Sequence, residues 1–143
     1  MEEGITYLKQ LFHLPEIHPK QYSPLTLAYI GDAVYELVIR TILVSQANVQ
    51  VNKLHHRASS LVKAEKQSEL VGILEPYFTP EEAHIYKRGR NAKSYTSAKN
   101  ASITDYRRAT GFEAVMGYLY LEGEYDRMLD LIKRGIAPEE TQE

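Results

Sequence analysis

The sequence predicts an all-α fold, and three observations lead to this prediction. Apolar residues recur at the three-to-four-residue spacing of amphipathic helices along most of the chain. No segment shows the sustained alternation of apolar and polar residues that is typical of a strand between turn residues. At 143 residues, 43% hydrophobic and 25% charged, the chain has the size and composition of one globular domain. We therefore expect a single helical domain over residues 1–143, with its core at about 23–135 and a loose tail at 136–143.

The N-terminal half is expected to hold four helices. A short helix over residues 5–14 leads into a loop that ends at Ser23 and Pro24. Serine caps the start of a helix and proline fits its first turn, so these two residues open a long helix that extends to about residue 44. Two shorter helices, each with apolar residues on one side, then occupy most of residues 52–74.

The next helix begins at a strong start signal. Thr79, Pro80 and Glu82 combine a capping box with a proline in the first turn. The helix that they open runs into the basic stretch KRGRNAKS. The small and polar residues 91–102 that follow indicate a loop.

Two helices complete the chain. Ser102 or Thr104 caps a second strongly apolar helix over residues 105–122, which Gly123 closes. A last amphipathic helix is expected over residues 125–134.

The two strongly apolar helices each hold a carboxylate among small residues. Asp32 lies in LAYIGDAVYELVIR, with Ala28 one turn before it, and Glu113 lies in FEAVMGYLYL, with Gly117 one turn after it. Because both helices are apolar on nearly every face, we expect both carboxylates to be buried. A buried carboxylate without a partner is unfavourable, so each requires a cation.

Two interpretations of these carboxylates follow from the residues alone. The small neighbours leave room for a hydrated cation and a phosphate, and magnesium commonly takes only one or two protein carboxylates. Alternatively, each carboxylate forms a buried ion pair that has no chemical role. The candidate counter-ions for such pairs are Arg40, Arg107 and Arg108.

A basic stretch indicates an anionic partner. The net charge is -2, yet residues 84–108 hold seven Lys and Arg against one Asp. Such a local excess favours binding to nucleic acid phosphates, although a solvated loop without a partner is the alternative. The candidate RNA-binding residues are Lys87, Arg88, Arg90, Asn91 and Lys93.

The tyrosines are assigned mainly to packing. Tyr29 and Tyr35 lie inside the first apolar helix, where burial is the expected role. Tyr86 and Tyr95 flank the basic stretch and are considered as base-stacking residues.

Several classes of protein can be set aside. The chain has no cysteine, its five histidines lack zinc-ligand spacing, and it contains no GxSxG, GxxxxGK or GxGxxG motif. Its N-terminus is acidic rather than basic, and no apolar run reaches the roughly 20 residues of a membrane span. We expect a soluble, cytoplasmic protein.

The two apolar helices also resemble a known family. LAYIGDAVYELVIR resembles the signature helix of the ribonuclease III family, and TGFEAVMGYLYLE resembles the later catalytic helix of that family. The resemblance extends over residues 23–122. Two positions depart from the family pattern, because Ala28 and Thr110 stand where the family usually has acidic residues. The departures, the stretch KRGRNAKS and the expected lack of a double-stranded-RNA-binding domain resemble a small branch that consists of the nuclease domain alone.

The resemblance implies a fold, an activity and partners. It implies a homodimer with the ribonuclease III endonuclease-domain fold and a Mg²⁺-dependent endoribonuclease that cleaves double-stranded RNA. Asp32 and Glu113 would be the catalytic residues and the metal ligands. By resemblance to the branch, the substrate would be the 23S ribosomal RNA precursor, with the pre-ribosomal particle as a further partner. The alternatives are a non-catalytic double-stranded-RNA-binding dimer of the same fold and a helical dimer that scaffolds a protein complex.

Overall fold

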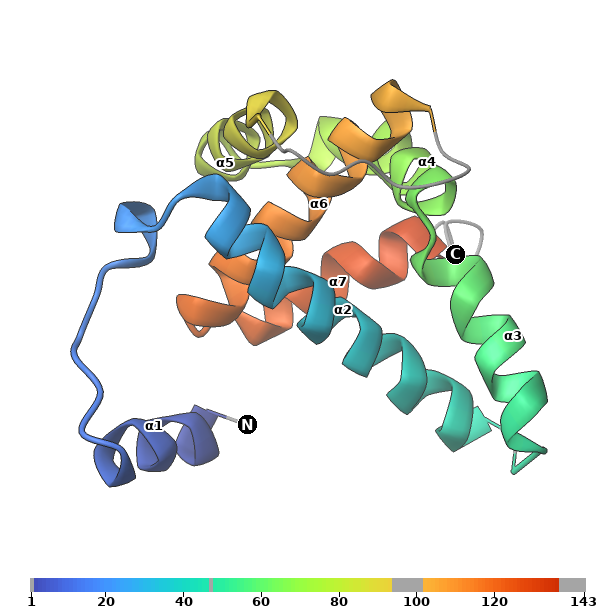
Figure 1. Cartoon of the computed structure of the whole chain (residues 1–143), viewed down its shortest axis with the longest axis horizontal. Coiled ribbons are helices and arrows are strands. Elements are labelled where there is room, and N and C mark those ends of the chain that lie inside the picture. The colour runs from blue at the N-terminus through green and yellow to red at the C-terminus, as the bar shows by residue number, and fades with distance from the viewer. Residues whose placement is uncertain (1, 47, 94–101, 137–143) are drawn as a thin grey trace.

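Every regular element in the described part of the chain is helical (Figure 1). The structure is a computed structural model that describes residues 2–46, 48–93 and 102–136. Its α-helices are α1 (Glu2–Leu11), α2 (Pro24–Gln46), α3 (Val51–Val62), α4 (Ala64–Leu74), α5 (Pro80–Asn91), α6 (Ile103–Leu121) and α7 (Tyr125–Ile136). Two short 3₁₀ turns, η1 (Pro19–Gln21) and η2 (Glu75–Tyr77), join α1 to α2 and α4 to α5. The all-α prediction is confirmed.

The predicted helix starts are present as hydrogen-bonded caps. Ser23 and Ser102 each accept a hydrogen bond from the backbone N–H three residues later, at 3.2 and 3.0 Å. The N–H of Glu82 donates to the Thr79 hydroxyl at 3.1 Å, and the N–H of Thr79 donates to Glu82 Oε1 at 2.9 Å. These bonds satisfy N–H groups that have no partner within the first helical turn, which fixes where α2, α5 and α6 begin.

The largest difference from the expected boundaries concerns α1. The sequence predicts a helix over residues 5–14, whereas α1 ends at Leu11. His13 has a φ of 52°, a left-handed conformation that a helix cannot continue through. In Figure 1, α1 lies apart from the helices that form the core.

Helix α6 is the centre of the core. It packs against α2, α4, α5 and α7, and Figure 1 shows it crossing behind α2 in the middle of the molecule. Phe112, Val115 and Met116 of α6 are fully buried, and the Phe112 ring meets Tyr35 of α2 edge-on with a centroid distance of 5.1 Å. The apolar composition of α6 is therefore explained by neighbours on several sides.

Glycines allow α6 to approach α2 and α5 closely. A Cβ atom at Gly31 of α2 would overlap the carbonyl oxygen of Glu113, and one at Gly117 would overlap the carbonyl oxygen of Leu27. A Cβ at Gly89 of α5 would lie 2.9 Å from the Cα of Gly111. Backbone contacts this short exclude any larger residue, so these glycines set the spacing of the three helices.

The remaining expectations concern membrane-spanning helices, the loose C-terminal tail and the loop before α6. In the part of the chain that the structure describes, no helix has the length and apolar character needed to cross a bilayer. Ile136, the first residue of the expected loose tail, ends α7, and the rest of that tail lies outside the described residues. The expected loop at 91–102 is described only at its two ends.

An ion pair between the buried Glu82 of α5 and the half-buried Arg127 of α7 gives a testable pH dependence. The Arg127 guanidinium donates to both oxygens of Glu82 at 2.9 Å, and its second Nη2 bond reaches the Tyr77 carbonyl at 2.6 Å. Burial alone would raise the pKa of Glu82, but Arg127 and the Thr79 N–H outweigh it and hold that pKa below its ordinary value. The charged carboxylate therefore stabilises the fold above its unfolded-state pKa, and this contribution is lost as the pH falls.

We expect Glu82→Gln to lower the free energy of unfolding by about 1–2 kcal/mol at pH 7, because glutamine keeps the cap geometry but removes the charge. The difference from wild type should disappear in acid, below the lowered pKa of Glu82. Urea unfolding at the two pH values measures it. Glu81→Gln is the matched control, since Glu81 is exposed and pairs with Lys20 at the surface. An equal loss for Glu82→Gln at both pH values would contradict the charge-based explanation.

Candidate functional site

Asp32 and Glu113 meet where α2 crosses α6. Gly31, which directly precedes Asp32, lies against the backbone of Glu113. This close approach brings the two carboxyl groups within hydrogen-bonding range of each other. Two residues that are 81 positions apart in the sequence therefore form one site.

The expectation that both carboxylates are buried is wrong for Asp32. The Asp32 side chain is exposed, while Glu113 is half-buried. The reason is that α2 presents only one face to α6, through residues such as Leu27 and Ile39. The opposite face of α2 is open in the single chain, and Tyr29 is 82% exposed there, so Tyr29 does not pack within its own chain.

The Glu113 carboxyl group has an unusual pKa. Its burial, together with a hydrogen bond to Asp32 and the charge of that carboxylate, raises the pKa of Glu113 to about 9. Burial disfavours a charge, and a second carboxylate disfavours it further. When both groups are ionised, the site therefore holds two adjacent negative charges. A bound cation would relieve the repulsion between them.

The arginines considered as counter-ions do not fill this role. Arg40 pairs with Glu36 one turn earlier on α2, at 3.4 Å. Arg108 lies against α4, where its Nη2 is 3.4 Å from the place of a Cβ on Gly72. Among the ion pairs of the described residues, none includes Asp32 or Glu113. The interpretation as buried ion pairs is not supported there.

The predicted RNA-binding residues lie at the end of α5 and beyond it, on more than one face. Lys87, Asn91 and Lys93 are exposed, whereas Arg88 and Arg90 are half-buried. Arg88 and Arg90 are two residues apart, about 200° around the helix, so they lie on opposite flanks. The Arg90 Nε donates to Asn91 Oδ1 at 3.3 Å.

Tyr86 belongs to the core rather than to this basic surface. It is 3% exposed, and the Arg90 guanidinium covers its ring at 5.6 Å from the centroid. Its face is therefore not available to a base, and the base-stacking interpretation is wrong for this residue. Tyr95 lies outside the described residues.

Comparisons with known proteins establish the family. Residues 25–124 match the ribonuclease III domain. A Mini-ribonuclease 3 from Clostridium tetani is 55% identical over 115 residues, which cover 80% of this chain and 76% of the relative. One from Staphylococcus aureus is 44% identical over 122 residues, covering 84% of this chain and 91% of the relative. The chain belongs to the Mini-ribonuclease 3 branch of the ribonuclease III family. It is an endoribonuclease.

A solved structure supports the same fold for this chain. The crystal structure of a protein from Fusobacterium nucleatum superposes with a TM-score of 0.75 at 29% sequence identity. The match covers 83% of this chain and 95% of the Fusobacterium protein. The ribonuclease III endonuclease-domain fold is thereby confirmed.

The two departures from the family pattern leave this member of the Mini-ribonuclease 3 branch with a small set of acidic groups. Ala28 is buried and has no polar atom to offer, and the Thr110 hydroxyl donates to the Tyr106 carbonyl at 3.0 Å. Within the described residues, no group of three or more His, Cys, Asp or Glu side chains gathers in a metal-binding arrangement. Asp32 and Glu113 are the residues here that could hold a metal.

Sequence reasoning missed one residue of this site. Gln67 of α4 is 2% exposed, and its carboxamide lies close enough to Glu113 to favour the charged carboxylate. The available signal was a glutamine in phase with the buried residues Leu70, Val71 and Leu74. This spacing indicates a buried glutamine, but only the position of α4 beside α6 shows that Gln67 lies next to Glu113.

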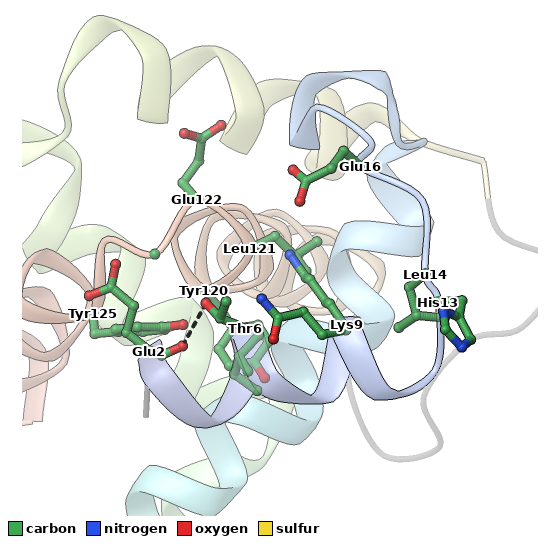
Figure 2. Close-up of a pocket in the computed structure, with 13 residues that line it drawn as sticks. Glu2, Thr6, Lys9, His13, Leu14, Glu16, Tyr120, Leu121, Glu122 and Tyr125 are labelled. Carbon is green, nitrogen blue, oxygen red and sulfur yellow. Dashed lines mark hydrogen bonds between the residues drawn. The ribbon is translucent and has the colours of Figure 1, made fainter.

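A polar cavity near the N-terminus is separate from this site. A cavity of about 520 Å³ lies between α1 and the end of α6, with Thr6, Lys9 and Glu122 among the residues around it (Figure 2). Neither Asp32 nor Glu113 lines it. The nuclease chemistry is therefore not assigned to this cavity.

Proposed function

We propose that this endoribonuclease depends on Mg²⁺ and cleaves double-stranded RNA, with Asp32 and Glu113 as its metal ligands and catalytic residues. The observation that carries this proposal is the contact between the two carboxyl groups without a cationic partner among the described residues. Carboxylate oxygens are the ligands that Mg²⁺ prefers, and one or two of them suffice when water and phosphate provide the others.

The environment of the two carboxylates fits a divalent cation. A nearby double positive charge favours the ionised form of Glu113, whose pKa is otherwise raised to about 9. Asp32 is exposed, so it leaves access for a phosphate, while Glu113 is half-buried on α6, which packs against α4. When bound here, a magnesium ion supplies an acidified water molecule and neutralises charge on the phosphate.

We further propose that the basic residues of the α5 end grip the RNA backbone. A-form RNA is recognised mainly through its shape, its phosphates and its 2′-hydroxyls, for which exposed Lys, Arg and Asn side chains are suited. The exposed side chains of Lys87, Asn91 and Lys93 support this role. Only one of the flanking residues Arg88 and Arg90 can face the same duplex, because the helix separates them.

Replacing Lys87, Arg88 and Arg90 together by Ala should weaken duplex binding about tenfold or more, alike for all sequences. The slope of log K against log salt should fall by up to about 2, since Lys87 and one of the two arginines can contact phosphates of the same duplex. Filter binding in Ca²⁺ at several salt concentrations measures both. Lys133→Ala, an exposed lysine of α7, is the matched control. Unchanged affinity of the triple variant would place the RNA elsewhere.

The open face of α2 supports a homodimer. Leu25, Tyr29, Leu37 and Val44 are 38–82% exposed along this helix. Large apolar side chains in a row on one helix favour burial against a second copy, and two sites in a dimer would cut both strands of a duplex. We propose that each copy, residues 1–143, forms one nuclease domain.

The proposed natural substrate is the 23S ribosomal RNA precursor in the cytoplasm, within or near the pre-ribosomal particle. This proposal rests on the resemblance to the branch rather than on any contact in the structure. A transcript whose paired ends copy those of the precursor tests it. Cleavage at the ends of the mature RNA is expected, whereas cutting of generic duplexes with none at these ends would contradict it.

A further inference from the structure

Gln67 stands out among the buried polar residues of the described chain. Four polar or charged side chains are buried there: Gln67, Ser68, Glu82 and Thr110. The Glu82 carboxylate pairs with Arg127, and the Thr110 hydroxyl bonds to the Tyr106 carbonyl. Both of these groups are satisfied by the fold itself. Gln67 is different, because its Oε1 is a buried acceptor without a hydrogen-bond partner among the described residues.

The donor side of the same carboxamide is anchored on α3. Gln67 Nε2 donates to the carbonyl of Val62, the last residue of α3, at 2.8 Å. The carboxamide also lies close enough to the Glu113 carboxyl group to favour its charged form. The bond to Val62 turns Nε2 towards α3, which fixes the orientation of the carboxamide and leaves Oε1 without a partner among the described residues.

This arrangement is not explained by stability. Leaving a buried carbonyl oxygen unpaired is unfavourable, and an apolar side chain of similar length would fill the same space without that loss. Buried polar groups that are not fully satisfied concentrate where a site needs them. The α3 carbonyl acts as an anchor, and the group that the anchored amide reaches is one of the two carboxylates of the site.

We propose that Gln67 is a positioning residue, whose carboxamide, anchored on Val62, holds the Glu113 carboxylate beside Asp32 in the orientation that receives the metal. Thr110 and Ala28 provide no carboxylate to constrain Glu113 from α6 or α2, so the constraint comes from α4. The inference rests on the proposed metal site. Groups that orient a metal ligand typically change metal affinity by about 10- to 100-fold.

Gln67→Met tests this role, because methionine has a similar length and no amide. Mn²⁺ is titrated into the RNA-free protein, and the paramagnetic broadening of the Glu113 side-chain ¹³C resonance gives the affinity even when binding is weak. We expect the affinity to fall about tenfold or more, whereas the matched control Ser68→Ala, the adjacent buried residue of α4, should bind as wild type does. In cleavage assays, the Mg²⁺ concentration for half-maximal rate should rise by a similar factor, with a smaller change at saturating Mg²⁺.

The outcomes separate this inference from the proposed function. If wild type shows no broadening at Glu113, the metal site itself is wrong and the role of Gln67 fails with it. If wild type and Gln67→Met bind Mn²⁺ equally, the metal site stands and the positioning role alone is overturned.

A reciprocal measurement covers the case in which Gln67→Met does not fold. In Glu113→Ala, the side-chain ¹H–¹⁵N resonances of Gln67 should shift, because the carboxyl group beside the amide is removed, while those of the exposed Gln46 should not. Unchanged Gln67 resonances would overturn the inference.

Discussion

Asp32→Asn and Glu113→Gln are each expected to lower the rate of duplex RNA cleavage by more than about 1,000-fold, which corresponds to about 4 kcal/mol of activation free energy. Each replacement keeps the size of the side chain but removes a charge on which the metal depends. Single-turnover cleavage at saturating RNA measures the chemical step. Glu36→Gln is the matched control, since Glu36 lies one turn beyond Asp32 and pairs with Arg40.

The same variants should leave the fold intact, and Glu113→Gln should stabilise the metal-free protein. The pKa of Glu113 is raised to about 9 in the fold. Ionising this group in the folded state is unfavourable, so stability falls as the pH rises from the ordinary carboxyl pKa towards 9. At pH 7–8 the glutamine variant avoids that loss, and we expect a gain of about 1–2 kcal/mol. A large fall in melting temperature for Asp32→Asn or Glu113→Gln would count against a metal site and favour a structural role.

Gly31→Ala is expected to have the largest effect on stability. Its methyl group would overlap the carbonyl oxygen of Glu113 and lie 2.7 Å from the Gly117 nitrogen. Both neighbours are backbone atoms of α6, so they cannot rotate away, and the two central helices must separate. We expect a loss of about 3 kcal/mol or more in the free energy of unfolding, measured by urea denaturation.

Gly72→Ala is the control for Gly31→Ala. Gly72 lies inside α4, and a Cβ there would make an ordinary contact with Arg108 at 3.4 Å. Alanine favours a helix over glycine, so this variant should be neutral or slightly more stable. If Gly31→Ala is tolerated as well as Gly72→Ala, the close approach of α2 and α6 does not depend on the absence of a side chain at residue 31.

The parts of the fold that depend on local chemistry could be predicted from the sequence. Ser23 and Thr79 mark helix starts because their hydroxyls meet N–H groups three residues later, a relation contained within one turn. The pairing of Asp32 with Glu113 was also foreseeable, since each is the carboxylate in a strongly apolar helix with small neighbours. Its geometric cause was not foreseeable, because the fit of Gly31 against Glu113 depends on how α2 crosses α6.

The errors share one physical origin. A helix that is apolar on every face does not reveal which face its neighbours leave open. Asp32 and Tyr29 were therefore expected inside, although both are exposed in the single chain. Gln67 was missed for a related reason. A polar residue on an amphipathic helix is ordinarily assigned to the exposed face, and its burial becomes clear only from the packing of α4 against α6.

The most direct test of the central claim is the cleavage of a labelled RNA duplex by the purified protein, with Mg²⁺ and with a chelator in its place. A metal site formed by Asp32 and Glu113 predicts cuts in both strands with Mg²⁺, binding without cleavage in the chelator, and no comparable cleavage of a single strand. Cleavage that continues in the chelator, or a duplex that is bound but left intact with Mg²⁺, would contradict it.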